Sequence, residues 1–464
     1  MTILTFVRTS LILSLSAFLA GGAAAQTSPA PEGSTLELVD LPVPEDYYPG
    51  LKRILEQAGR QAPELVRVGL DREIARENLK VARSRHYPSV GVGGNVGYRF
   101  VQRSGEDDDS SLSASVSAGI SRPLYFWGAV SAGVEKGEID FETSLLRTRE
   151  RFQETVQSLR EEYLRLILNE MRLRNLRLRR NNLETQMARK ESDYRAGRLS
   201  EEEYLDFQIE LDRSLIEISE LEDERNQLIS SFRRISGVET IPEIPGGIAP
   251  IDLDALEAEL RGEENPGPDW VDRTFNVQLN RNTMEKIDRD AIIIRSRQRP
   301  NISFSASVSQ APVNTATAND VDSIRWFAGL SVSWNVFDGF ATQASRRINL
   351  LEKRRLESRM RSNEQLLDEQ RIEIHSELLS MIRKQRLAER RFDLDSRIYS
   401  RVKGEYSEGR VSTNQFRQTQ SDFYVKEYNL HLSRFLLLRT ITDYLVTLNA
   451  DRSTDYLEFG ETDV

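Results

Sequence analysis

Alternating apolar and small polar residues mark two segments of the chain, 88–126 and 300–338, as β-structure. Within each segment, most alternate residues are Val, Ile, Ala, Leu or aromatic, and most residues between them are Ser or Gly. A period of two is typical of a strand whose two faces meet different surroundings. The pattern therefore predicts two strands in each segment. The clearest run of polar positions is Ser303, Ser305, Ser307 and Ser309.

Long stretches without proline follow both strand pairs, at 129–195 and 340–407. They predict helices far longer than the usual helix of a globular domain. In the first stretch, one set of apolar residues falls into seven-residue phase, which is the pattern of a coiled coil. The set comprises Phe152, Val156, Leu159, Tyr163, Leu166, Leu173 and Met187.

Shorter helices are predicted to run beside the long ones. Segments 200–236 and 270–298 together match the length of the first long helix and can stack end to end along it. Segments 412–448 and 51–86 can do the same for the second. Segment 237–269 is rich in Pro and Gly, so we expect a linker there that meets the two ends of the chain at mid-height of the helices.

Three landmarks recur at a spacing of about 210 residues, which indicates an internal duplication. Pro88 and Pro300 precede the strand pairs, and Gly128 and Gly339 close them. We expect these four residues to be strand–helix junctions. The third landmark is a glycine at the end of each long helix. The duplication divides the chain into an N-terminal extension (26–50), repeat 1 (51–236), a linker (237–269), repeat 2 (270–448) and a C-terminal tail (449–464).

Both long helices are predicted to reverse at a glycine that adopts the left-handed conformation. Ser200 with Glu203, and Ser412 with Gln415, have the spacing of a capping box for the following helix. These reversals are called the helix tips below. Their residues are Gly197, Arg198, Leu199 and Ser200 in the first tip, and Gly409, Arg410, Val411 and Ser412 in the second.

The first 25 residues have the pattern of a secretory signal peptide. Arg8 precedes an apolar run, and small residues ending at Ala25 follow it. That run is too short to span a bilayer, and no later segment offers about 20 consecutive apolar residues. Any contact with a membrane interior must therefore use the strands.

The composition excludes several classes of chemistry. The chain has no Cys and three His, so thiolate chemistry is excluded and a metal site is not expected. A formal net charge of −10 disfavours a nucleic-acid partner. Because no phosphate loop, nucleophile elbow or pair of catalytic carboxylates stands out, we expect neither an enzyme nor a bound cofactor.

The alternating strands allow two interpretations. A soluble sandwich would alternate as well, but rows of Ser and Gly suit a water-filled lumen better than an ordinary solvent-facing surface. Each run is long enough to cross a bilayer as a tilted strand. Four strands cannot close a barrel, so membrane insertion requires several copies. A dimer would give eight strands and a trimer twelve, and the pattern does not choose between them.

In the order of its elements the chain resembles TolC-type outer-membrane efflux proteins. The resemblance rests on the duplicated series of helix, two strands, long helix, glycine turn and returning helix, and on the Ala82–Pro88 entry to the first strand pair. It covers about residues 51–448. It implies a mixed α and β membrane protein: a trimeric twelve-stranded barrel with four strands per chain, continued by a coiled-coil helical tunnel in the periplasm.

The resemblance also implies partners and a gate. The helix tips would dock onto a periplasmic membrane-fusion adaptor, which joins the homotrimer to an inner-membrane pump of the RND, ABC or MFS type. Glu203 matches the family's acidic residue after the first tip glycine, and Tyr406 its tyrosine before the second, so a Tyr406–Glu203 link is the implied gate. Gln415 and Gln418 stand where the best-known relative has acidic residues, and Arg410 lies one residue before the place of its gating arginine.

We therefore expect an outer-membrane channel of a tripartite efflux or type I secretion system, seated in outer-membrane lipid. It would conduct solutes passively from the periplasm to the exterior and open at the helix tips. The alternative is a periplasmic or surface coiled-coil scaffold whose strands form a soluble β-domain.

Overall fold

The computed structural model describes residues 41–101, 109–262, 270–310, 313–314 and 324–453. All of them belong to one compact unit, Asp40–Val464. The predicted signal peptide, residues 26–40 of the predicted extension and the tail beyond residue 453 lie outside the described residues. Residues 102–108, 311–312 and 315–323 of the two predicted strand segments, and residues 263–269 of the predicted linker, also lie outside them.

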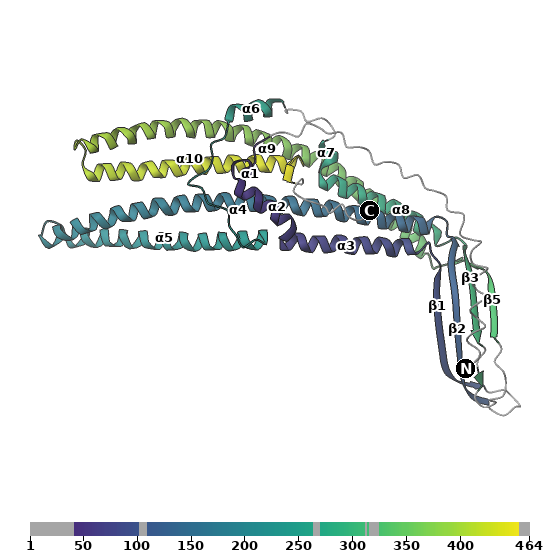
Figure 1. Ribbon diagram of the computed structural model, residues 1–464. Helices are drawn as coiled ribbons and strands as arrows, with labels where there is room; N and C mark the ends of the chain where they lie inside the picture. The colour runs from purple at the N-terminus through teal and green to yellow at the C-terminus, as the bar shows by residue number, and fades with distance from the viewer. Residues whose placement is uncertain (1–40, 102–108, 263–269, 311–312, 315–323, 454–464) are drawn as a thin grey trace. The chain divides into compact units, whose positions relative to one another are not determined.

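The strands form one antiparallel sheet with the order β1-β2-β3-β5 (Figure 1). A two-residue strand, β4, pairs with β2 outside this path. The bounds are β1 Ser89–Val101, β2 Asp109–Tyr125, β3 Asn301–Gln310, β4 Val313–Asn314 and β5 Ile324–Ser333. The last strand ends before the expected position 338, because Trp334 turns away to hydrogen-bond the carbonyl of Gln298 and Asp338 caps the next helix.

The sheet has two chemically different faces, and both are exposed in the single chain. Val92 and Trp326 on the apolar face are each 76% exposed. On the other face, serine hydroxyls pair across strands, with Ser303 Oγ lying 2.7 Å from Ser331 Oγ. No second sheet covers the apolar face within the described parts of the chain. A soluble sandwich would bury that face, and the described residues do not form a second layer of strands over it.

Two long antiparallel helical hairpins dominate the rest of the fold (Figure 1). Helix α4 packs against α5, α9 packs against α10, and α10 also contacts α4. Helix α8 joins the hairpins because it packs against both α4 and α9. The bounds are α4 Ala129–Arg195, α5 Glu201–Ser236, α8 Phe275–Ser296, α9 Ala341–Ser407 and α10 Thr413–Thr447.

One predicted packing is wrong. The N-terminal helical segment was expected to run beside the second long helix, but α3 (Pro63–Ser84) packs against α4 instead. Arg83 Nη2 lies 3.0 Å from a carboxylate oxygen of Glu138, and Gly137 leaves room for Ala82. The small side chains at this crossing let the two helices approach closely, which length arithmetic cannot foresee.

Two predicted helices are divided. The segment expected as one helix over 51–86 consists of α2 (Pro49–Gln61) and α3, with an extended Ala62 between them. Proline disfavours the helical conformation of the residue before it, which explains this break. The segment 270–298 is likewise divided at the extended Thr274, into α7 (Trp270–Arg273) and α8. The linker contains a helix that the sequence did not predict, α6 (Leu253–Gly262).

The coiled-coil pattern of the first long helix is confirmed by burial. Phe152, Val156, Leu159, Leu166 and Leu173 have no exposed surface. Tyr163 is also buried, and Met187, toward the tip, is half-buried. The core therefore follows one stripe of α4 and is densest around its middle.

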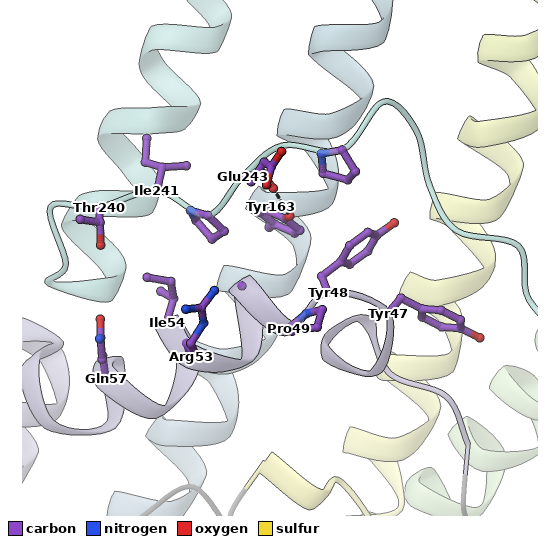
Figure 2. A pocket seen from close by; sticks show the side chains of 13 residues that line it. Tyr47, Tyr48, Pro49, Arg53, Ile54, Gln57, Tyr163, Thr240, Ile241 and Glu243 are labelled. Carbon is purple, nitrogen blue, oxygen red and sulfur yellow. Dashed lines mark hydrogen bonds between the residues drawn. The ribbon is translucent and has the colours of Figure 1, made fainter.

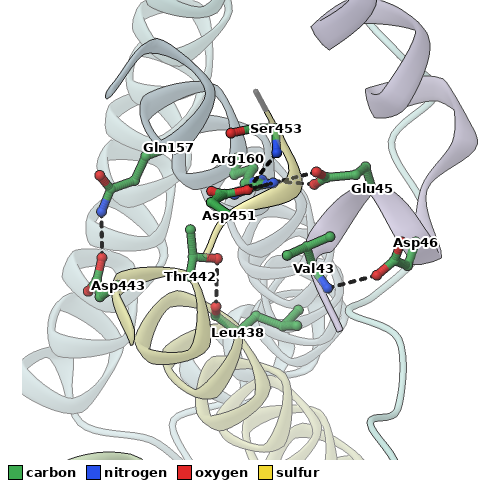
Figure 3. A network of polar contacts seen from close by, with 10 residues as sticks. All are labelled: Val43, Glu45, Asp46, Gln157, Arg160, Leu438, Thr442, Asp443, Asp451 and Ser453. Carbon is green, nitrogen blue, oxygen red and sulfur yellow. Dashed lines mark hydrogen bonds and ion pairs between the residues drawn. The ribbon is translucent and has the colours of Figure 1, made fainter. Parts of the chain in front are cut away.

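The linker and both described ends of the chain meet on the middle of α4, as predicted. The Tyr163 hydroxyl donates a hydrogen bond to the Glu243 carbonyl, 2.8 Å away. Arg160, one turn earlier on α4, binds Glu45 of α1 (Pro44–Tyr47) and Asp451 after α10 (Figure 3). We call this region the central junction: Glu45, Arg160, Tyr163, Glu243 and Asp451.

Candidate functional site at the helix tips

The first tip has the geometry of a Schellman turn. Gly197 has a φ of 71°, and the Arg198 N–H donates to the Asp193 carbonyl at 2.8 Å. The Arg198 guanidinium also binds the Asp193 carboxylate, 2.7 Å away. The tip is thus closed by one backbone and one side-chain interaction between the same two residues.

The second tip repeats this geometry. Gly409 has a φ of 73°, and the Arg410 N–H donates to the Glu405 carbonyl at 2.9 Å. The side chains differ from the first tip, because the Arg410 guanidinium pairs with the carboxylate of Glu408, 3.0 Å away, and not with that of Glu405. Leu199 and Val411 take equivalent places and are partly buried, whereas the arginine before each is exposed. Both tips therefore have an exposed arginine followed by a partly buried aliphatic residue.

The two caps differ. In the first tip, the Glu203 N–H donates to Ser200 Oγ at 3.2 Å, and the Ser200 N–H donates back to the Glu203 carboxylate. In the second, the Gln415 N–H donates to Ser412 Oγ at 3.2 Å, but the reciprocal bond of the expected capping box does not form. A neutral amide oxygen is a weaker acceptor than a carboxylate at the positive end of a helix, which accounts for the difference.

The structure does not bring the candidate gate residues together within one chain. Glu203 is engaged in its own cap, and the Tyr406 ring stacks on Phe416 with centroids 4.4 Å apart. Gln418 donates to Asp422 at 3.1 Å. Among the described residues, no contact joins Tyr406 to Glu203, so a link between them would have to form between copies of the chain.

Stacked aromatic rings continue from Tyr406 into the second hairpin. Tyr399 stacks on Phe416 and, with centroids 4.5 Å apart, on Phe423. Phe392 extends the contact on the other side of Phe423. This row was missed from the sequence because its members alternate between two helices. The stacked rings join α9 to α10 behind the second tip.

The strand–helix junctions are held by residues next to the predicted ones. Gly128 has a φ of 80°, and the indole N–H of the preceding Trp127 donates to the Pro300 carbonyl at 2.9 Å. Gly339 has a φ of 64°, and the carboxylate before it, Asp338, accepts the Thr342 N–H at 3.0 Å.

Trp127 thus ties the first junction to the second. Trp127 and Asp338 each stand directly before a left-handed glycine, and this position is the sequence signal that could have identified them. Pro88 directly precedes β1, where its missing N–H leaves no ladder hydrogen bond unmade.

A cavity of about 550 Å³ opens beside the central junction (Figure 2). Tyr48 and Tyr163 form part of its wall, and linker residues close one side. The Tyr48 hydroxyl accepts the Ala249 N–H at 2.9 Å, so the linker is fastened on both sides of the cavity.

A histidine anchors the linker farther along. The Ile248 N–H donates to His431 Nδ1 at 2.8 Å, which requires the neutral ring. Burial, Arg434 and Arg174 lower the pKa of His431 to about 4. Arg434 also donates to the Ile248 carbonyl at 3.0 Å. Both polar groups of Ile248 are therefore held by α10.

Within the described residues, no group of three or more His, Asp or Glu side chains could hold a metal ion. Among the helices of that same part of the chain, none has the length and apolar character of a membrane span.

The fold is that of outer membrane channel proteins. A membrane protein from Pseudomonas aeruginosa aligns with a TM-score of 0.70 at 15% identity, covering 92% of this chain and 100% of that one. The Campylobacter jejuni CmeC outer membrane channel aligns with a TM-score of 0.70 at 10% identity, over 89% and 91%. The Neisseria gonorrhoeae MtrE outer membrane channel, in its open state, gives 0.64 at 14% identity, over 86% and 89%.

Residues 54–238 match the sequence model of the outer membrane efflux protein family. The resemblance to outer-membrane efflux proteins that the sequence predicted is thereby confirmed. No curated protein matches the chain by sequence.

Proposed function

We propose that the protein is the outer-membrane channel of a tripartite efflux or type I secretion system. Three copies join their sheets into a twelve-stranded barrel, and their helices continue it as a periplasmic tunnel that conducts solutes passively to the exterior. The observation that carries this proposal is the sheet itself: it has one exposed apolar face, one face of Ser and Gly, and two open edges.

The open edges require further copies. Strands β1 and β5 each pair on one side only within the described chain. Unpaired backbone groups in hydrocarbon cost several kcal/mol each, so β1 of one copy must pair with β5 of the next before the sheet can enter a bilayer. The apolar face then contacts lipid, and the Ser/Gly face lines water.

The helices also carry apolar side chains that other described residues leave exposed. On α3, Val66, Leu70, Ile74 and Val81 are all at least half exposed and fall near one side of the helix. On α9, Leu387, Leu394 and Ile398 repeat at coiled-coil spacing and are about half exposed. Contacts between copies would bury both stripes and build the tunnel wall.

The tips are proposed as the docking surface for a periplasmic adaptor, which links the trimer to an inner-membrane pump. Their support is the equivalent placement of Arg198 with Leu199 and of Arg410 with Val411 in the two repeats. A trimer would present six such tips in a ring, which a repeating adaptor assembly could engage.

The gate is proposed between neighbouring tips, through Tyr406 of one copy and Glu203 of another. Both side chains are exposed at the tips and free of each other within one chain. Arg410, Gln415 and Gln418 lie near the same opening. The two glutamines leave that part of the ring uncharged, so the closed aperture depends on neutral hydrogen bonds there.

Detergent extraction and planar bilayers test the channel. We expect a heat-modifiable trimer in outer-membrane fractions that conducts ions after reconstitution. The combined variant Glu203→Ala with Tyr406→Phe should raise single-channel conductance, whereas the neighbouring Glu202→Ala should not. Recovery of a detergent-free monomer from periplasmic extracts would instead favour the coiled-coil scaffold.

The absence of Cys makes a second test clean. Glu203→Cys with Tyr406→Cys should be joined between copies by a short bismaleimide, which would hold the channel at low conductance. A direct disulfide is not expected, because it needs Cβ atoms about 4 Å apart and the tyrosine and glutamate side chains of the proposed link span a longer distance. Glu202→Cys with Tyr406→Cys is the matched control. Equal cross-linking in both pairs would remove the gate assignment but leave the channel intact.

A further inference from the structure

Phe327 is an exception to the Ser/Gly face of the sheet. By alternation it shares that face with Arg325, Gly329, Ser331 and Ser333. Its ring lies along this face, because a methyl group in place of the Gly329 hydrogen would lie 3.1 Å from Cζ of Phe327. Among the side chains that the structure describes, it is the one aromatic group on the Ser/Gly face of the four long strands.

The residues level with Phe327 are small. Phe327 pairs with Ser307 on β3, Ser307 with Gly119 on β2, and Gly119 with Gly91 on β1. The Phe327 ring therefore lies at one end of a row across the sheet, and the three other residues of that row have side chains too small to cover it. The side chain is 55% exposed, with Gly329 beneath the ring.

A cation lies next to the ring on the same face. Arg325 is exposed, pairs with Ser309, and lies two residues along the strand from Phe327, a separation of about 7 Å between Cα atoms. The next residues across the sheet at its level are Ser117 and Gly93. The guanidinium and the ring can thus reach one solute over a floor of small side chains.

We propose that Phe327 and Arg325 form a recognition site in the barrel for solutes that combine an aromatic ring with a negative charge. The ring offers a stacking surface, and the guanidinium pairs with a carboxylate or sulfonate. The inference rests on the proposed function, because the Ser/Gly face must line the conduit. Three copies would place three such sites around one lumen.

A purely structural role gives a different expectation. Aromatic side chains also stabilise edge strands by covering a glycine, and β5 is an edge strand of the single chain with Gly329 under the ring. In that case Phe327→Leu would lower the stability of the oligomer and leave solute recognition unchanged. Arg325 would then contribute neither to the stability of the oligomer nor to solute recognition.

Block of the ion current in planar bilayers tests the site with the full chain. The blocker is added on the side of the bilayer opposite the helix tips. We expect 2-naphthalenesulfonate to block the wild-type channel at lower concentrations than methanesulfonate does. Phe327→Leu and Arg325→Gln should each raise the half-blocking concentration about fivefold or more, and Phe327→Tyr should preserve it. Each variant is first checked for the heat-modifiable oligomer.

Trp326→Leu is the matched control, because this aromatic side chain belongs to the same strand and the opposite face. It should leave the block unchanged. Equal block of wild-type protein, Phe327→Leu and Arg325→Gln would overturn the inference while the measured current still supports the channel. A wild-type oligomer that carries no current would overturn the proposed function and this inference with it.

Discussion

Arg160 and Glu45 form a fully buried ion pair that fastens the N-terminal segment to the middle of α4 (Figure 3). Arg160 Nε lies 2.8 Å from one carboxylate oxygen of Glu45, and Nη1 lies 2.6 Å from Asp451. Burial by itself would lower the pKa of Arg160, but the two carboxylates raise it above its ordinary value. One guanidinium thus holds both ends of the described chain.

Removing this guanidinium should destabilise the fold strongly. Arg160→Met leaves two buried carboxylates without a counter-charge, and we expect a loss of about 3–5 kcal/mol. The control is Arg165→Met, which removes an exposed pair with Glu161 and should cost at most about 1 kcal/mol. Thermal unfolding followed by circular dichroism, with limited proteolysis near both ends of the chain, measures the difference. Equal melting temperatures would contradict the role of the junction.

Two neighbouring glycines of the linker should respond differently to a methyl group. In Gly247→Ala the new Cβ would lie 2.5 Å from the His431 ring, so the linker must move away from α10. In Gly246→Ala no atom lies within 4 Å of the new Cβ. Hydrogen exchange at the Ile248 amide should therefore rise in the first variant and stay near the wild-type rate in the second. Similar rates in both would show that the linker is not held by this contact.

Acidification should loosen the linker through His431. Because the folded pKa is about 4 and the ordinary value is 6.5, the unfolded state binds more protons between these values. The contribution of neutral His431 to the free energy of unfolding is complete above about pH 6.5 and is lost as the pH falls toward 4. Protonated Nδ1 cannot accept the Ile248 N–H, so amide exchange at Ile248, corrected for its intrinsic pH dependence, should accelerate as the pH falls to about 4. His431→Asn should remove that pH dependence, and its persistence would assign the effect to another group.

The stability of the two helix tips should depend differently on the third residue after the capping serine, which is Glu203 in the first tip and Gln415 in the second. Ser200→Ala and Ser412→Ala should each cost about 1 kcal/mol at the start of the following helix. Glu203→Ala should also weaken its tip, because it removes the reciprocal bond to Ser200. Gln415→Ala should have little effect. Hydrogen exchange over the first turns of α5 and α10 provides the measurement, and an equal response of both tips would refute the asymmetry.

Local chemistry explains why so much of the fold was predictable. Left-handed Gly197 and Gly409, the Ser200 cap and the heptad stripe of α4 depend on residues within a few turns of one another. The alternation of the strands likewise follows from the pleat. These features need no knowledge of distant contacts.

The missed features join residues far apart in the chain. Nothing near Arg160 in the sequence indicates Glu45 and Asp451 as its partners, and its burial is unusual for an arginine. The place of α3 on α4 depends on close approach at Gly137. Phe327 was overlooked because a single large residue does not disturb a period of two, although it changes what that face can bind.

The strands with their two unlike faces, the long helices and the chemistry of the tips could be predicted from the sequence alone, because short-range periodicity and capping encode them. The tertiary structure decided which helices pack together, how the linker and the ends of the chain converge on Arg160, and that the sheet stays a single open layer within one chain. Those outcomes depend on shape complementarity and on pairing of buried charges between distant segments, which no local pattern specifies.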